Sequence, residues 1–199
     1  MKRIHHVFLY MRKEIHMRRL KTGDRVFFPE TRKACGTPIE GIVIYLHDDG
    51  TTDIQTTGVD AGPFPNDPYH VQYCGIKMRE FYRTYKDRMA DGTSLHLLDT
   101  WSGGTGVKGI NALREGAMRH DDFAAAFDRA WLGRMNPYDD SRAFFVSNVG
   151  VYDDSYINSD CVLAPVITIK KDFIAVKGSR WEVTKEKSTD LSALFACLI

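Results

Sequence analysis

Residues 20–57 read LKTGDRVFFPETRKACGTPIEGIVIYLHDDGTTDIQTT, and this stretch decides the fold. A first strand is expected at residues 26–28, ending at the proline that follows, and a second over residues 42–46, which are mostly β-branched or aromatic. Asp49-Gly50 predicts a hairpin turn, because glycine takes the positive φ of such a turn without steric cost. Residues 51–56 then alternate as a returning strand does.

The order of these signals is similar to that of a known family. K-x-G-D-x-V at residues 21–26 is followed by G-x-V-x-x-x-x-x-D-G-x-x-D-I at residues 41–54. The pattern resembles the opening of an SH3-like small barrel of the Tudor or KOW kind. This resemblance implies a small β-barrel that binds peptides, nucleic acids or protein partners, or that serves as a spacer. A fold of this kind does not select among those functions.

Composition limits the classes of protein to consider. The 199 residues suffice for one large or two small domains, and a hydrophobic content of 43% is enough for a real core. The net charge of +1 provides no global field for nucleic acid. The four cysteines form no C-x-x-C pair, which argues against a zinc ribbon or a thioredoxin-type redox site. We expect a reduced cytoplasmic protein without a membrane span, in the host cytoplasm if the chain is phage-encoded.

The segment after these strands is rich in proline and aromatic residues. Prolines at positions 63, 65 and 68 exclude a helix and a central strand there. Residues 69–73 alternate, which predicts a short strand that closes the barrel. This aromatic loop is the first place to look for a ligand, and the candidate contacts are Phe64, Tyr69 and Tyr73.

Residues 76–89 are predicted to form an amphipathic helix, whose apolar side carries Met78, Phe81, Tyr82 and Tyr85. The rest of the helix is locally basic, which suits contact with a phosphate backbone. The candidate nucleic-acid-binding residues are Lys77, Arg79, Arg83 and Lys86. The alternative is an ordinary solvated helix face, and the near-neutral net charge of the chain favours that alternative.

A glycine-rich turn is found at residues 103–109, between an expected strand at residues 95–99 and a helical segment. Backbone amides at such a turn can hold a phosphate group. The spacing matches neither a P-loop nor a G-x-G-x-x-G motif placed in a βαβ unit, and the alternative is an exposed loop. A phosphorylated small molecule bound here would contact Gly104, Gly106, Lys108, Arg114 and His120.

The rest of the chain predicts a helix followed by strands. Residues 120–135 have helical spacing after two acids that can cap a helix start, and an apolar helix is expected at the C-terminus. Strands are expected at residues 144–147, 161–170, 173–176 and 181–184, the last two as a hairpin. Paired aspartates recur, but such pairs are ordinary at turns, so we predict no metal site. Residues 143–170 resemble a C-type-lectin-like domain of unknown function found in phage tail and secreted bacterial proteins.

These observations predict an α+β protein, in which an N-terminal SH3-like small β-barrel precedes a mixed α/β domain with an antiparallel sheet. The expected units are a basic extension at residues 1–19, the barrel plus helix at residues 20–90, and an α+β domain at residues 91–199. The first function predicted is a non-enzymatic binding protein with a protein or ligand partner: an adaptor, a virion component or an inhibitor encoded by a phage. The alternatives are an enzyme or receptor for a phosphorylated small molecule, and a nucleic-acid binder. We expect no cofactor and no catalytic residue, and a homodimer is in keeping with an exposed barrel edge.

Overall fold

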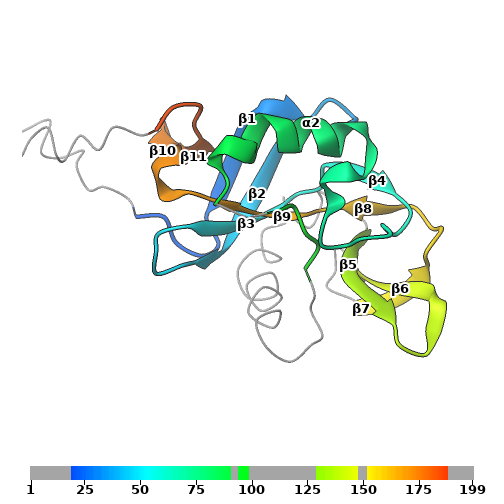
Figure 1. Cartoon of the computed structure of the whole chain (residues 1–199). Helices are drawn as coiled ribbons and strands as arrows, with labels where there is room; N and C mark the ends of the chain where they lie inside the picture. The colour runs from blue at the N-terminus through cyan, green and yellow to red at the C-terminus, as the bar shows by residue number, and fades with distance from the viewer. Residues whose placement is uncertain (1–18, 91–93, 99–128, 148–151, 188–199) are drawn as a thin grey trace, which may run out of the picture.

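The computed structural model describes residues 19–90, 94–98, 129–147 and 152–187. Within these residues the protein is mostly β, with two sheets and a single α-helix, α2 (Gly75–Tyr85) (Figure 1). The first sheet contains, in spatial order, β10 (Ile174–Lys177), β11 (Arg180–Val183), β1 (Arg25–Arg32), β2 (Pro38–Leu46), β3 (Thr52–Thr56) and β9 (Val166–Ile169). The second contains β4 (Asp60–Gly62), β8 (Cys161–Leu163), β5 (Arg129–Asn136), β6 (Asp139–Ser147) and β7 (Tyr152–Tyr156). Three single turns of 3-10 helix complete the described elements: η1 (Val71–Tyr73), η2 (Lys86–Arg88) and η4 (Lys171–Phe173).

The first sheet is built on an antiparallel meander of β1, β2 and β3, which confirms the strand order predicted for residues 20–57. The turn between β2 and β3 has Gly50 at a φ of +86°, as its Asp-Gly sequence predicts. β1 does not end at Pro29 but runs on to Arg32, and its register with β2 shifts between Phe28 and Arg32. The irregularity lets the strand continue through a residue that has no N–H to donate.

Strands from the far end of the chain pair with both outer edges of this meander. β11 runs parallel to β1, with Val26 opposite Trp181, and β9 runs antiparallel to β3, with Ile54 opposite Ile167. The hairpin of β10 and β11 confirms the hairpin predicted near the end of the chain. One sheet therefore combines strands from both sides of residue 90, as Figure 1 shows by colour.

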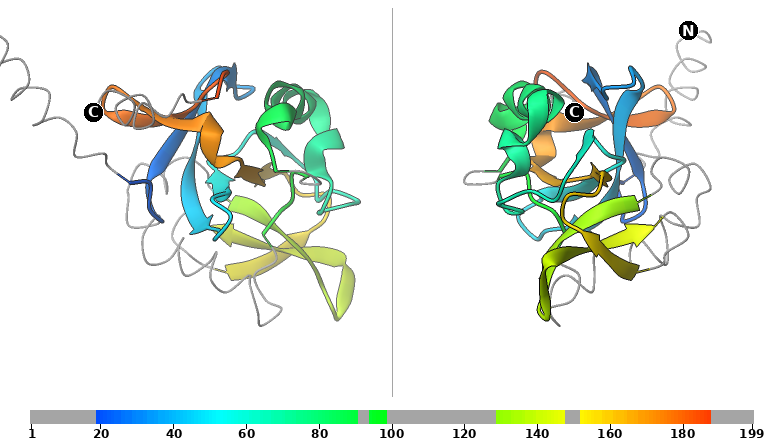
Figure 2. Two further views of the ribbon diagram at one scale, coloured as in Figure 1. Left: turned by 60° about the vertical axis from the view of Figure 1, so that its left-hand side comes forward. Right: turned by 90° about the vertical axis from the view of Figure 1, so that its right-hand side faces the viewer.

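The second sheet lies beside the first, and β5, β6 and β7 form its outer part (Figure 2). The chain passes between the sheets at residues 57–59, which join β3 to β4, and again at residues 164–165, which join β8 to β9. The second crossing is held by β3, because Gln55 donates a side-chain hydrogen bond to the Ala164 carbonyl and Thr56 Oγ1 donates to the Pro165 carbonyl at 3.0 Å. An apolar cluster spans the crossing, formed by Ile42, Ile44, Leu98, Ala130, Leu132, Ala164 and Val166.

The helix α2 packs on β1 through three aromatic rings. Phe28 lies 5.1 Å from Phe81 and 5.2 Å from Tyr85 between ring centroids, both in edge-on arrangements that aromatic pairs prefer. Arg88 in η2 anchors the end of the helix by an ion pair with Glu30, with Nη1 2.5 Å from Oε1 and Nη2 3.0 Å from Oε2. The amphipathic helix expected at residues 76–89 is confirmed, with Met78, Phe81 and Tyr85 buried and Tyr82 half-buried.

The predicted fold class is wrong. An α+β protein with an N-terminal SH3-like barrel and a mixed α/β domain is not what the described residues form, because both sheets are open and a single α-helix accompanies them. The physical reason is edge pairing. The edges of β1 and β3, which a small barrel would join to its own later strands, are paired instead with β11 and β9.

Four local expectations are also wrong. The strand expected at residues 161–170 is divided at residues 164–165 into β8 and β9, which belong to different sheets. Residues 71–73 form the 3-10 turn η1 instead of a strand, and residues 95–98 make a single bridge through His96. The helix expected over residues 120–135 is contradicted by β5, while its first part lies outside the described residues. Gly133 in this strand lies against residue 97. A Cβ at this position would lie 3.2 Å from the Leu97 carbonyl oxygen, so the glycine permits a close approach of two chain segments.

Gly41 in β2 allows an equally close approach to β3. A Cβ at Gly41 would lie 2.6 Å from the carbonyl oxygen of Gln55 and 2.6 Å from Cγ2 of Ile54. We expect Gly41→Ala to lower the free energy of unfolding by about 1–3 kcal/mol, the usual cost of overpacking, in urea denaturation followed by circular dichroism. Gly62→Ala is the control, because nothing lies within 4 Å of the added Cβ, and it should change stability by less than about 0.5 kcal/mol. An equal loss in both variants would contradict this account.

Tyr85 predicts a stability change at alkaline pH. Burial raises the pKa of its hydroxyl to about 12, and the oxygen accepts a hydrogen bond from the Glu30 N–H at 3.0 Å. Because the folded pKa is above that of the unfolded chain, this stabilising contribution is complete below about pH 10 and is lost as the pH rises towards 12. We expect Tyr85→Phe to reduce the slope of unfolding free energy against pH between about 10 and 12, measured by urea denaturation at each pH. The exposed Tyr69→Phe should leave the wild-type slope intact.

Candidate functional site

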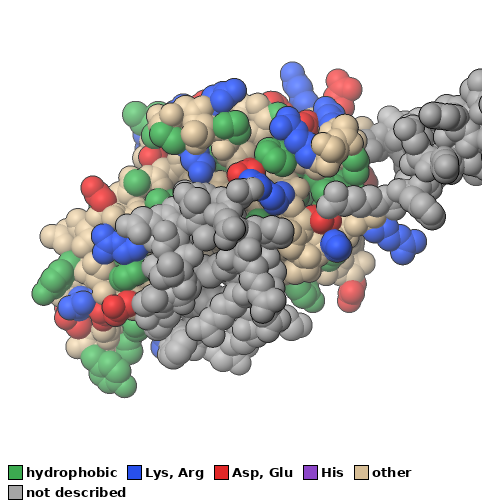
Figure 3. Space-filling model, turned by 180° about the vertical axis from the view of Figure 1, so that it is seen from behind, with side chains coloured by type: hydrophobic (Ala, Val, Ile, Leu, Met, Phe, Trp, Pro, Cys, Tyr) green, Lys and Arg blue, Asp and Glu red, His purple; other side chains and the backbone are tan. Residues whose placement is uncertain are grey.

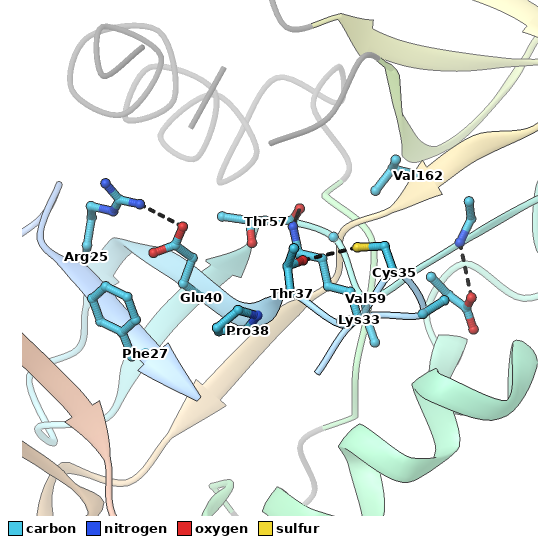
Figure 4. A pocket seen from close by; sticks show the side chains of 14 residues that line it. Arg25, Phe27, Lys33, Cys35, Thr37, Pro38, Glu40, Thr57, Val59 and Val162 are labelled. Atoms are coloured by element: carbon cyan, nitrogen blue, oxygen red, sulfur yellow. Dashed lines mark hydrogen bonds and ion pairs between the residues drawn. The ribbon is translucent and has the colours of Figure 1, made fainter. Parts of the chain in front are cut away.

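A pocket of about 670 Å³ lies where the chain leaves the first sheet for the second (Figure 4). One wall is the loop that joins β1 to β2, and the facing wall is the segment at residues 57–61 that leads into β4. A single side chain of β8 completes the far side. The lining residues are Arg25, Phe27, Lys33, Ala34, Cys35, Thr37, Pro38, Glu40, Thr57, Gly58, Val59, Asp60, Ala61 and Val162.

The loop at residues 33–37 has a defined shape because its own backbone closes it. The Lys33 N–H donates to the Thr37 carbonyl at 2.9 Å, and the Gly36 N–H donates to the Lys33 carbonyl at 2.9 Å. Gly36 has a φ of +84°, which glycine adopts without steric cost. Arg32 adds a hydrogen bond from Nη1 to the Gly36 carbonyl at 3.0 Å. The loop is therefore a fixed wall of the pocket.

Lys33 connects the two walls. Its Nζ donates to the Thr57 carbonyl at 3.0 Å, across 24 residues of sequence. Partial burial lowers the pKa of the Lys33 amine from its ordinary value, against smaller raising effects of Cys35 and Glu40. The side chain thus uses a donor within the protein and carries its charge less readily than a surface lysine does.

Glu40 lies on β2 and shares only one of its carboxylate oxygens with a described partner. Arg25 Nη2 donates to Glu40 Oε1 at 2.6 Å. Glu40 Oε2 is out of contact with solvent and has no hydrogen-bond partner among the described residues. Thr57 Oγ1, in the facing wall, is also out of contact with solvent and has no hydrogen-bond partner among the described residues. The Thr57 N–H donates to the Glu40 carbonyl at 2.7 Å, so the two unsatisfied side chains belong to neighbouring residues of the pocket lining, both labelled in Figure 4.

Phe27 fills the space between two arginines on the outer face of the first sheet. The Arg180 guanidinium carbon lies 4.6 Å from its ring centroid and that of Arg25 lies 6.0 Å away, distances typical of cation–π contact. Arg180 is itself paired with Glu182, the residue opposite Phe27 on β11, at 2.7 Å. Two Arg–Glu pairs therefore flank one ring, and only the pair of Arg25 with Glu40 belongs to the pocket lining.

Cys35 is exposed at the rim of the pocket. Its Sγ lies 3.1 Å from the Thr37 hydroxyl oxygen. Hydrogen bonding from the Thr37 side chain, then from the Thr37 backbone N–H, lowers the pKa of the Cys35 thiol, with a smaller contribution from the charge of Lys33. Cys74, in contrast, is half-buried, and desolvation followed by the charges of Asp67 and Asp60 raises the pKa of its thiol.

The aromatic ligand candidates are not brought together in this pocket. Phe64 is half-buried and packs edge-on against Trp131 at a centroid distance of 5.6 Å, which makes it part of the core. Tyr69 and Tyr73 are exposed, at 52% and 68% of their surfaces. Neither lines the pocket described above, so they stay predictions as ligand contacts.

The basic helix candidates lie on α2 and in η2, where the structure gives two of them internal partners. Lys77 pairs with Glu80 at 2.7 Å, and Arg79 donates to the Tyr73 carbonyl at 3.3 Å, while Arg83 and Lys86 are exposed. On the face in Figure 3, Lys and Arg side chains are interspersed with Asp and Glu over the described surface. Nucleic-acid binding through this helix stays a prediction. The phosphate-binding candidates Gly104, Gly106, Lys108, Arg114 and His120 lie outside the described residues.

The pocket residues were not among the sequence-based candidates. The loop between the first two strands was expected, but nothing local identified the segment that faces it, because residues 57–61 and Val162 are brought there by the second sheet. The available signal was the chemistry of the loop itself. Lys33, Cys35 and Thr37 occur within five residues of a hairpin connection, next to a glycine.

Comparison with protein family models, with curated proteins and with solved structures finds no match to this chain. The resemblances to Tudor or KOW proteins and to the lectin-like domain therefore stay predictions. Among the described residues, no helix has the length and apolar character required to cross a membrane. The same residues contain no group of three or more His, Cys, Asp or Glu side chains placed to hold a metal ion.

Gly58 allows the pocket wall at residues 57–61 to lie close to β8, and substitution of this glycine tests how tightly the two segments pack. Gly58 has a φ of +96°, and a Cβ there would lie 2.4 Å from Val162 Cγ1. Gly58→Ala should lower the free energy of unfolding by about 2–4 kcal/mol, combining backbone strain with overpacking. Gly36→Ala shares the positive φ but has nothing within 4 Å of the added Cβ, so it should cost only about 1–2 kcal/mol.

The clash of Gly58→Ala with Val162 can be isolated in a double-mutant cycle by chemical denaturation. Adding Val162→Ala should recover about 1 kcal/mol or more of the Gly58→Ala loss, because the two sites are in contact. No coupling between them would show that strain alone explains the loss.

Proposed function

We propose that the protein is a non-enzymatic binding protein, and that the pocket between residues 33–37 and 57–61 holds a small organic ligand with a positively charged hydrogen-bond donor. The observation that carries the proposal is a pair of buried polar atoms without hydrogen-bond partners in lining residues, the carboxylate acceptor Glu40 Oε2 and the hydroxyl Oγ1 of Thr57. A buried acceptor without a partner costs free energy, which a donor from a ligand would recover.

The size and lining of the pocket suit such a ligand. A volume of about 670 Å³ falls within the range of small-molecule sites. Apolar surface comes from Pro38, Val59, Val162 and two alanines, and the ring of Phe27 lies at one end. These side chains favour a ligand with an aromatic or aliphatic body attached to its polar group.

The charges of the lining favour a donor over an acceptor on the ligand. Formal charge is balanced, with Arg25 and Lys33 against Glu40 and Asp60. The cations are already used within the protein, Arg25 by Glu40 and Lys33 by the Thr57 carbonyl. The Glu40 side chain keeps 18% of its surface exposed, so its carboxylate is not sealed off from a ligand.

Recognition is supported over catalysis by the environment of the Cys35 thiol in the lining. The hydrogen-bond partner of its Sγ is the Thr37 hydroxyl, which is not a general base, and the Lys33 amine of the same loop donates to the Thr57 carbonyl. A protein that acts by recognition suits the adaptor, virion-component or inhibitor roles that the sequence predicts. The phosphate-binding and nucleic-acid alternatives gain no support from this pocket.

Benzylamine is a suitable probe, and benzoate is its control because it has a similar body and the opposite charge. We expect benzylamine at millimolar concentration to shift the backbone amide resonances of residues 33–37 and 57–61 in two-dimensional NMR spectra of the labelled protein. Glu40→Gln should weaken this binding at least about tenfold, since a charge-assisted hydrogen bond contributes about 1.5–3 kcal/mol.

The matched control variant is Glu182→Gln, which removes the other Arg-paired carboxylate on the same sheet face but lies outside the pocket lining. Its affinity for benzylamine should equal that of the unmodified sequence. The proposal is wrong if benzylamine leaves the pocket amides unshifted, if benzoate binds there equally well, or if Glu40→Gln binds the amine unchanged.

A further inference from the structure

The pocket rim carries a thiol that the proposed ligand contact does not use. Cys35 is exposed on a loop whose backbone hydrogen bonds fix its position, and its Sγ lies 3.1 Å from Thr37 Oγ1. Lys33, two residues earlier, places an amine in the same loop. Hydrogen-bond donors and a cation near a thiol stabilise its thiolate, which is the reactive form.

A second and independent feature points to a ligand at this place. Thr57 is buried, with a residual exposure of 1%, yet its hydroxyl oxygen has no hydrogen-bond partner among the described residues and it lines the same pocket. Cys35 and Thr57 line the same pocket, from the loop at residues 33–37 and from the facing segment at residues 57–61, and Figure 4 draws Thr37 between them. A group attached to Cys35 therefore has a lined space beside it, with a polar atom that lacks a partner.

We propose that Cys35 is a site of reversible covalent capture, at which a low-molecular-weight disulfide exchanges and leaves one of its thiol halves bound in the pocket. The Cys35 thiol loses its proton to solvent, and the thiolate attacks one sulfur of the disulfide. The disulfide S–S bond breaks as the bond to Cys35 Sγ forms, and the other half leaves as a thiolate. A free thiol reverses the reaction by the same exchange. This inference rests on the proposed function only in using the same pocket.

Thr37 is the positioning residue for this reaction, because it acts on the disulfide only through the Cys35 sulfur. Its side chain and its backbone N–H both lower the pKa of the thiol. Replacing the hydroxyl by a methyl group removes the side-chain hydrogen bond and preserves the β-branched shape. Serine at the same position restores the hydroxyl and provides a rescue.

The test uses the full chain and the uncharged probe 2-hydroxyethyl disulfide. Samples taken over time are quenched with acid, and peptide mapping by mass spectrometry gives the extent of modification at each cysteine separately. Cys74 is the internal reference, since it is half-buried and burial raises the pKa of its thiol. We expect Cys35 to react at least about tenfold faster than Cys74 at neutral pH, from its larger thiolate fraction and its exposure.

Two variants separate the role of Thr37 from a general effect on folding. Thr37→Val should slow the reaction at Cys35 about two- to fivefold while leaving that at Cys74 unchanged, and Thr37→Ser should return it to the original rate. Equal rates at Cys35 and Cys74 overturn the proposal. A Cys35 rate that does not respond to Thr37→Val overturns the assigned role of the hydroxyl.

The location of the captured group is tested by NMR on the fully modified protein. Capture in the pocket shifts the amide resonances of residues 57–61 as well as those of residues 33–37, and Cys35→Ser treated in the same way shows neither change. Shifts confined to residues 33–37 would place the group in solvent and overturn that part of the proposal. Benzylamine binding is measured separately, so failure of the amine to bind refutes the proposed function while the exchange at Cys35 is judged by its own rates.

Discussion

The edges of the β1–β2–β3 meander are the constraint on which the rest of the structure depends. Each edge strand presents a row of backbone N–H and C=O groups that must find partners when they are buried. β11 supplies them to β1 and β9 supplies them to β3. The segment at residues 161–183 must therefore lie against β1 and β3. The second sheet is formed by strands that lie between β3 and β9 in the sequence.

The pocket is a consequence of that route. After β3 the chain leaves the first sheet at residues 57–59, while β8 returns beside it before β9 rejoins the sheet. Gly58 lets the outgoing segment approach Val162, and Lys33 ties the same segment to the loop between β1 and β2. Three pieces that are distant in sequence thus enclose one hollow. Its polar atoms lie at a junction between sheets, where neither ladder supplies them with partners.

Local signals predicted the parts of this fold that depend on neighbouring residues. The meander, the Asp49-Gly50 turn, the amphipathic helix and the final hairpin all follow from turn chemistry and periodicity within about 15 residues. The pairing of strands that are distant in sequence does not follow from such signals, because the pairing of Val26 with Trp181 has no local signature. β5 shows the same limit. Its run Ala130 to Gly133 is buried throughout, and a short buried strand cannot be told from a buried helix segment by spacing alone.

The candidate site was missed for a related reason. The sequence predicts Phe64 as a ligand contact because it lies in an aromatic, proline-rich loop, but its ring packs against Trp131 in the core. The loop at residues 33–37 contains reactive residue types, and only the tertiary structure shows what faces them. An aromatic residue of the core differs from an aromatic residue of a binding site in its burial and in the contacts of its atoms. Sequence patterns do not report either property.

Two arginine–glutamate pairs that involve the first sheet illustrate this distinction. Arg88 Nη2 donates to Glu30 Oε2 at 3.0 Å, while the buried Nη1 lies 2.5 Å from Oε1 without making a hydrogen bond, and the pair holds the end of α2 against β1. Arg25 meets Glu40 through one oxygen, and the other is buried without a partner at the pocket. A pair that serves the fold alone gains most when all its acceptors are satisfied, because each unsatisfied buried oxygen costs free energy. Each pair leaves one buried atom without a hydrogen bond, but only Glu40 lines the pocket, and its unpaired acceptor specifies a donor as the group to be recognised.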